Sequence, residues 1–229
     1  MIDKSVEGPA EALAGLGDGM SVMVSGFGGA GVPVALLRAL DAAGAKNLTL
    51  IVNAARFVYY NAAALFDDRR VRRVVCSAAR HRESESSAYE RQWTAGELEI
   101  EMVPQGTLAE RIRAGGAGIP AFFTPTGVGT ELTAGKEVRR FDGRDCVLET
   151  ALTADYAILR AHVADRWGNV RFHGTQANFG PAMASAARIA VVEVDHISDG
   201  PLDPLGVHLP GIHVDRVVAV SRQARGGRD

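Results

Sequence analysis

The residues whose types and spacing most clearly suggest chemistry form a glycine-rich turn near the start of the chain. Glycine permits positive φ angles and a close approach of the backbone to a ligand, and these glycines fit the spacing G-x-G-x-x-G. A helix that starts after such a turn presents unpaired N–H groups and a partial positive charge. The turn therefore predicts a site for a phosphate-bearing, nucleotide-like ligand, although a single motif of this kind also occurs as a plain tight turn. Its positions are Ser25, Gly26, Phe27, Gly28, Gly29, Ala30 and Gly31.

A dinucleotide site built on this motif also needs an acidic residue about 20 positions further on, where the acid holds the ribose. The second apolar segment ends instead at Asn53 and Ala54, without an Asp or a Glu. Arg56 follows closely and has the charge to meet a 2′-phosphate. An NADP-binding enzyme therefore remains an alternative, although a distant one.

The segments around the turn have the order strand, loop, helix, strand, which is typical of a parallel sheet. Residues 20–24 are apolar, residues 33–43 have helical spacing with a proline near the start, and residues 47–52 are apolar again. The sequence predicts an α/β fold with an open, mainly parallel sheet, helices on both faces, and glycine loops at the carboxyl ends of strands. Further strands are expected at 71–76, 98–103, 146–148, 156–160 and 190–194, further helices at 6–16, 62–65, 86–95, 108–114 and 181–187, and glycine-rich loops at 115–118 and 127–129.

The composition fits one compact domain. The chain has 229 residues, of which 47% are hydrophobic and 23% charged, with a net charge of −2. We expect a single domain over residues 1–220 and a flexible polar tail at 221–229. No basic field indicates a nucleic-acid partner. No apolar run is long enough to cross a membrane, and the first residues do not resemble a signal peptide, so a cytoplasmic location is expected.

The chain has two cysteines, Cys76 and Cys146, which lie far apart in apolar, strand-like runs. We expect both to be buried free thiols. Because the sequence has no CxxC pair and no cluster of cysteine and histidine, no metal site is predicted.

Stretches along nearly the whole chain resemble the A subunits of family I CoA-transferases. Around the glycine-rich turn, the resemblance rests on residues 18–19, 22–24, 26–27 and 31–33. Later stretches are longer and more specific, and they follow in the order that the family has. These stretches are 103–113, 115–123, 126–130, 165–169, 178–181 and 208–212. Within the family, the resemblance is to the A subunits of succinyl-CoA:3-oxoacid and 3-oxoadipate CoA-transferases.

The resemblance implies covalent, ping-pong catalysis without a metal or a tightly bound cofactor. A glutamate carboxylate attacks the thioester of an acyl-CoA, which forms an acyl anhydride and releases CoA thiolate. The thiolate then attacks the glutamyl carbonyl to give an enzyme–CoA thioester, which a second carboxylic acid resolves. In two-chain members this glutamate lies on the B subunit. The implied partners are therefore a B subunit, in an α2β2 assembly, and coenzyme A as a substrate, with succinyl-CoA as donor and acetoacetate or 3-oxoadipate as acceptor.

The resemblance also assigns roles to residues of this chain. Residues 25–31 would contact CoA. The side-chain amide of Gln105 would point into the active site, where an N–H donor stabilises a thioester oxyanion by about 3 kcal/mol. Asn53 stands where family members carry an active-site asparagine. The structural alternatives are a loop cap for Gln105 and a strand-closing residue for Asn53. Glu149 is a local candidate for the nucleophile, but a structural role at a strand end is the favoured interpretation.

The chain departs from the family pattern at several positions. Ser25 replaces a glycine, and Ala54 and Arg56 stand where relatives carry asparagine and glycine. Asn178 lacks the arginine that often precedes it. These changes fall in the region expected to hold the acyl substrate. They leave two alternatives open: a CoA-transferase-like hydrolase that uses water as acceptor, and a non-catalytic subunit that binds CoA.

Overall fold

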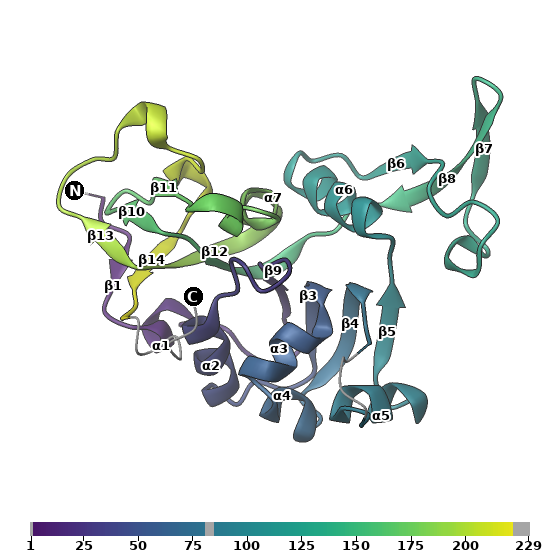
Figure 1. Cartoon of the computed structure of the whole chain (residues 1–229), viewed down its shortest axis with the longest axis horizontal. Coiled ribbons are helices and arrows are strands. Elements are labelled where there is room, and N and C mark those ends of the chain that lie inside the picture. The colour runs from purple at the N-terminus through teal and green to yellow at the C-terminus, as the bar shows by residue number, and fades with distance from the viewer. Residues whose placement is uncertain (1, 81–84, 222–229) are drawn as a thin grey trace.

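The computed structural model describes residues 2–80 and 85–221, and an eight-stranded sheet forms its centre (Figure 1). Every neighbouring pair of strands in this sheet is parallel. Its longer strands are apolar on both faces, as expected for a parallel sheet that helices cover on both sides. The predicted α/β class is therefore confirmed. In spatial order the strands are β1 (Ser5–Val6), β14 (Arg216–Ala219), β12 (Ala187–Val194), β9 (Ala154–Arg160), β2 (Ser21–Val24), β3 (Leu48–Ala54), β4 (Val71–Ala78) and β5 (Glu99–Met102).

The order of the strands reverses next to β2. From β2 the chain builds β3, β4 and β5 in one direction, and it then places β9 on the other side of β2, followed by β12 and β14. Such a reversal is the switch point of an open α/β sheet, and ligands of such folds commonly bind there, at the carboxyl ends of the strands. The glycine-rich turn follows β2, so the topology puts it at this switch point.

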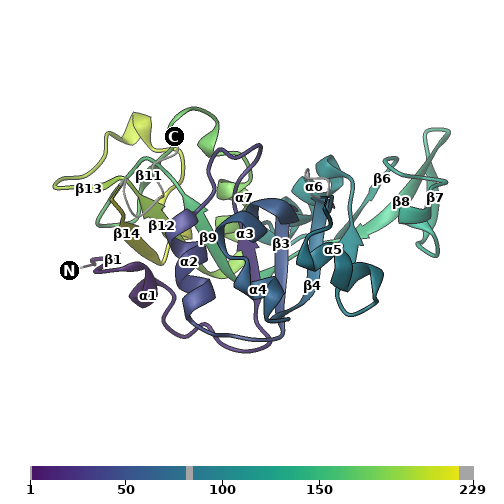
Figure 2. The ribbon, with the colours of Figure 1, turned by 60° about the horizontal axis from the view of Figure 1, so that its bottom comes forward.

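Helices cover both faces of the sheet, each over its own apolar cluster (Figures 1 and 2). One cluster contains Leu36, Leu37 and Phe66, and the other contains Leu108 and Met183. The first face carries α1 (Pro9–Ala12), α2 (Val34–Ala42), α3 (Ala55–Asn61), α4 (Ala64–Asp67) and α5 (Ala88–Thr94). The second face carries α6 (Gln105–Gly116) and α7 (Gly180–Ala186).

Two smaller sheets flank the main one. The first is an antiparallel arm that projects beyond α6, with β6 (Ala121–Thr124), β7 (Val138–Phe141) and β8 (Arg144–Thr150) (Figure 1). The second contains β10 (Val163–Asp165), β11 (Val170–Arg171) and β13 (His196–Ser198). Short 3-10 turns lie at Glu131–Thr133, Gly174–Gln176, Pro204–Gly206 and Gly211–His213.

The helix predicted over residues 6–16 is wrong. The segment starts with β1, which pairs with β14, and α1 spans only four residues. Gly8 is extended and Gly15 has a φ of 94°, so the backbone leaves the helical region on both sides of α1. The alanine and leucine residues that suggested a long helix, Ala12 and Leu13, instead pack into the first apolar cluster.

The glycine pair at 115–116 was predicted as a loop, but it forms the last turn of α6. A Cβ on Gly115 would stand 2.0 Å from the Leu152 carbonyl oxygen, and one on Gly116 would stand 2.1 Å from the Ser185 Oγ. Glycine is needed here because the helix packs closely on the neighbouring backbone, not because the chain turns.

Both cysteines are free and buried, as predicted. Burial raises the pKa of the Cys76 thiol to about 11, so this thiol is protonated at neutral pH and unreactive. No helix within the described ranges combines the length and apolar character needed to cross a bilayer. The predicted tail at 221–229 lies outside the described residues apart from Ser221, and the boundary at 220 stays a prediction.

Candidate active site

The glycine-rich turn forms a tight loop at the carboxyl end of β2. The amides of Phe27 and Ala30 each donate to the carbonyl of the other, both at 3.0 Å. Gly26 and Gly31 have φ angles of 126° and 72°. A Cβ on Gly31 would stand 2.5 Å from the Gln176 carbonyl oxygen. The glycines are therefore required by positive φ and by a chain segment that lies directly against the loop.

That neighbouring segment holds the loop through Asn178. Its Oδ1 accepts from the Gly26 amide at 3.2 Å, and its Nδ2 donates to the Ala30 carbonyl at 3.0 Å. The same Nδ2 also lies 3.1 Å from the carbonyl oxygens of Thr175 and Gln176. One side chain therefore joins both ends of the loop to the segment before α7. Asn178 has a φ of 23°, in the left-handed region that asparagine tolerates better than most residues.

Ser25 anchors the loop from below. Its side chain is buried, and its Oγ donates to the Gly31 carbonyl at 2.7 Å and accepts from the Arg160 amide at 3.3 Å. The hydroxyl thus links the loop to β9 across the switch point. Phe27 differs, because it is 50% exposed at the tip of the loop, where its ring lies 6.5 Å from that of Phe179.

The start of α2 does not offer all of its amides to a ligand, contrary to what the motif suggested. The Leu36 amide donates at 2.9 Å to Oε2 of Glu193, a fully buried carboxylate on β12. A buried anion at a helix N-terminus takes the place that a phosphate would otherwise occupy. The backbone of the loop itself is therefore the better candidate for contact with a ligand. The sequence carries a signal for this cap, since Glu193 is the only acid in a mostly apolar strand.

Asn53 lies at the carboxyl end of β3 and is almost fully buried, with 6% exposure. Ser77 on β4 places its Oγ 2.8 Å from the Asn53 Oδ1 and 3.0 Å from the Asn53 carbonyl oxygen. The serine hydroxyl bonds to the amide oxygen, and the Nδ2 group of Asn53 makes no hydrogen bond with the described part of the chain, so this group is the candidate donor to a ligand. No motif in the sequence marks Ser77 as a neighbour of Asn53.

Gln105 is the first residue of α6 and is exposed. Pro104 precedes it and provides no side-chain cap, so the first amides of α6 are left for solvent or a ligand. Within residues 2–80 and 85–221, the Gln105 side chain makes no hydrogen bond. A free carboxamide at the positive end of a 12-residue helix can donate to a developing oxyanion.

The fold brings the predicted site residues to one edge of the sheet. The loop follows β2, Asn53 ends β3, and Gln105 comes three residues after β5, and all of these strands are parallel. In Figure 1 the start of α6 lies above the carboxyl ends of β3, β4 and β5. Neighbouring strands are about 4.8 Å apart, so β3 and β5 are about 10 Å apart.

A family model described as Coenzyme A transferase matches residues 6–220. The chain belongs to this family. It is 50% identical over 225 residues to the A subunit of the 3-oxoadipate CoA-transferase of Pseudomonas putida, covering 98% of this chain and 96% of that protein. It is also 50% identical over 209 residues to the A subunit of the succinyl-CoA:3-ketoacid coenzyme A transferase of Xanthomonas campestris pv. campestris (strain B100), covering 90% of this chain and 85% of that protein. The solved structure of glutaconate coenzyme A-transferase from Acidaminococcus fermentans has the same fold, with a TM-score of 0.81 at 21% identity over 96% of this chain and 77% of that one.

The CoA-transferase family was predicted from the motifs, and that prediction is confirmed. A family of this kind uses coenzyme A as a substrate. Within the described ranges, no group of three or more His, Cys, Asp and Glu side chains is arranged to hold a metal ion.

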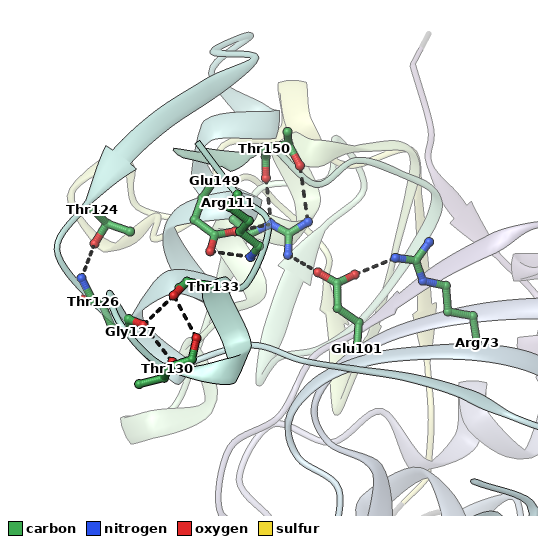
Figure 3. A network of polar contacts seen from close by, with 11 residues as sticks. Arg73, Glu101, Arg111, Thr124, Thr126, Gly127, Thr130, Thr133, Glu149 and Thr150 are labelled. Carbon is green, nitrogen blue, oxygen red and sulfur yellow. Dashed lines mark hydrogen bonds and ion pairs between the residues drawn. The ribbon is translucent and has the colours of Figure 1, made fainter. Parts of the chain in front are cut away.

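Glu149 lies in a network of ion pairs at the base of the arm (Figure 3). It is 3% exposed, and its Oε1 lies 2.7 Å from Nζ of Lys136. Arg111 on α6 lies 3.9 Å from the other carboxylate oxygen and donates to the Thr150 carbonyl at 2.7 Å. Two cations therefore hold Glu149, which supports the structural interpretation over a nucleophilic one.

The same network joins the arm to the edge of the main sheet. Arg111 also pairs with Glu101 on β5, which in turn lies 2.6 Å from Arg73 on β4. Burial raises the pKa of Glu101, but the hydrogen bonds and charges of Arg111 and Arg73 outweigh it and leave the pKa below its usual value. The network fixes α6, and with it Gln105, between the sheet and the arm.

Proposed function

We propose that this chain is the A subunit of a two-chain CoA-transferase that moves CoA from succinyl-CoA to a short 3-oxoacid. The observation that carries the proposal is the convergence of the glycine-rich loop, Asn53 and Gln105 at the carboxyl edge of one parallel sheet. Two relatives at 50% identity are named as A subunits of such enzymes, which supports a partner of the B type. An α2β2 assembly is the expected form.

The nucleophile in this proposal is a glutamate of the B subunit. Its carboxylate attacks the thioester carbonyl, the C–S bond breaks, and CoA leaves as a thiolate from an acyl-glutamyl anhydride. The thiolate attacks the glutamyl carbonyl, which releases succinate and leaves a glutamyl-CoA thioester. The acceptor acid then reverses both steps. Glu149, held by two cations, does not compete for this role.

In this proposal, the residues of this chain bind the acyl-CoA and polarise the carbonyl group that is attacked. The backbone of residues 25–31 contacts the acyl-CoA, and the buried hydroxyl of Ser25 acts indirectly by holding that loop. The carboxamides of Gln105 and Asn53 donate N–H groups to the oxygen that becomes negative when the carbonyl is attacked. One such donor in a dry site contributes about 3 kcal/mol to the transition state.

Co-expression tests the proposal. The chain is produced alone and together with the product of the neighbouring reading frame, and each sample receives succinyl-CoA with acetoacetate or with 3-oxoadipate. Transfer of CoA only in the co-expressed sample is the expected result. Transfer by the chain alone would contradict a nucleophile on the partner. Release of free CoA without an acceptor would instead identify a hydrolase, and absence of any reaction would favour a non-catalytic CoA-binding role.

A further inference from the structure

Arg56 lies beside the candidate site in the segment that departs from the family pattern. It is the second residue of α3, three positions after Asn53, and its side chain is partly buried. Ala55 and Val58 face the apolar cluster, so Arg56 and Phe57 lie on the outer side of the first turn. In Figure 1, α3 begins where β3 ends, at the same edge of the sheet as α6.

The guanidinium of Arg56 rests on an aromatic ring that lies close to the glycine-rich loop. Its Cζ lies 4.8 Å from the centroid of the Phe57 ring, a distance suited to a cation–π contact. Cε1 of Phe57 lies 3.8 Å from the point where a Cβ on Gly29 would stand. Through Phe57, the cation therefore lies next to the loop that we propose contacts the acyl-CoA.

No carboxylate of the described part of the chain neutralises Arg56. Arg73, Arg111 and Arg160, which lie around the same sheet, each form ion pairs with acidic side chains. Burial raises the pKa of the Tyr89 phenol to about 12, although the nearby charge of Arg56 lowers it slightly, so this phenol stays neutral. Among the described residues, the guanidinium of Arg56 therefore has an aromatic ring but no carboxylate beside it, in a partly buried position where a charged group is costly without an anion.

We propose that Arg56 is a specificity residue that binds the distal carboxylate of dicarboxylic acyl groups. Both the succinyl and the 3-oxoadipyl group carry such a carboxylate, and a guanidinium binds it through two parallel N–H···O bonds. Acetoacetate ends in a methyl group, which leaves the guanidinium without a partner. The site therefore favours 3-oxoadipate over acetoacetate as acceptor. This inference rests on the proposed function, because it places the acyl group between Asn53 and the loop.

The test uses the co-expressed complex with three variants, Arg56→Met, Arg56→Lys and, as a control of equal charge change, Arg72→Gln. Arg72 is exposed near the start of β4, at the opposite edge of the sheet from the site. In a ping-pong reaction, kcat/KM for each acceptor reports only the half-reaction with that acceptor. Thermal unfolding of each variant shows whether it is folded.

Wild type should have a higher kcat/KM for 3-oxoadipate than for acetoacetate. In Arg56→Met, kcat/KM for 3-oxoadipate should fall about 20-fold or more, as expected when a charge-assisted pair is lost, while that for acetoacetate stays within about 3-fold. Arg56→Lys keeps the charge but not the two parallel N–H donors of the guanidinium, so its kcat/KM for 3-oxoadipate should be intermediate. Arg72→Gln should change neither value.

Three outcomes would overturn the role of Arg56. They are a wild type that prefers acetoacetate, an equal loss for both acids, and no loss for either acid in Arg56→Met. An equal loss together with a raised KM for succinyl-CoA would place Arg56 on the CoA moiety instead of the acyl group. A wild-type complex that transfers CoA to neither acid would contradict the proposed function itself, so the two failures are distinguishable.

Discussion

Replacing Asn178 by alanine should open the glycine-rich loop while the protein stays folded. The side chain provides the two hydrogen bonds that join the loop to the segment before α7, one to the Gly26 amide and one to the Ala30 carbonyl. Each contributes about 1 kcal/mol, and alanine at the positive φ of this position costs about 1 kcal/mol more. The loop in Asn178→Ala should therefore open more easily by about 3 kcal/mol.

Hydrogen exchange of the co-purified complex measures this change directly. The amides of Phe27 and Ala30 bond to each other's carbonyls across the loop, so they report its opening. A destabilisation of about 3 kcal/mol corresponds to exchange about 100-fold faster, since each 1.4 kcal/mol is a factor of about ten. Asn178→Gly relieves the backbone strain but loses the same side chain, so exchange of the two amides should be about 30-fold faster than in wild type. The KM for the acyl-CoA should rise in both variants more than kcat falls.

Unchanged exchange of these two amides in Asn178→Ala would refute the argument that Asn178 holds the loop. Equal exchange in the alanine and glycine variants would refute the strain attributed to the positive φ. A matched control is Asn61→Ala, which removes a carboxamide that donates to the Phe57 carbonyl within α3. It should leave the exchange of the Phe27 and Ala30 amides unchanged.

Three further predictions each concern one side chain. Gln105→Ala should lower kcat for CoA transfer about 100-fold with little change in thermal unfolding, because it removes an oxyanion donor. Glu149→Gln should destabilise the fold by about 2 kcal/mol in denaturant unfolding, because it removes the carboxylate partner of Lys136 and one of the two carboxylates beside the buried Arg111. Ser21 donates its amide and hydroxyl to Asp155, and these bonds hold the pKa of Asp155 below its usual value. The stability that Asp155 contributes should therefore be full above about pH 4 and be lost as pH falls through the lowered pKa. In Asp155→Asn, the free energy of unfolding should depend less on pH over this acid range, the acid limb of the stability curve.

Each of these predictions has a result that would contradict it. Unaltered turnover in Gln105→Ala would show that Gln105 only starts α6 and has no role in CoA transfer. Normal stability but lost transfer in Glu149→Gln would make that carboxylate a nucleophile candidate again. An acid limb that is the same in Asp155→Asn and wild type would show that the contacts with Ser21 contribute no measurable stability.

Much of the fold could be predicted from local sequence patterns. The strands at 71–76 and 156–160 and the helix at 33–43 were located to within a few residues, because apolar periodicity and glycine punctuation are local signals. The arm with β6, β7 and β8 was missed except for part of β8. Its strands are short and partly exposed, so they lack the continuous apolar run of a central strand.

The sequence by itself determined the family, because motifs are properties of the chain. The resemblance to that family also named the glycine-rich turn, Asn53 and Gln105 as candidate site residues, and their roles stay predictions. Only the tertiary structure decided how the site is held. Glu193 caps α2 from β12, Asn178 holds the loop across 152 residues, and Arg56 rests on Phe57 beside the loop. Such contacts join strands and loops that are distant in sequence, and which of them meet is set by the order of strands in the sheet.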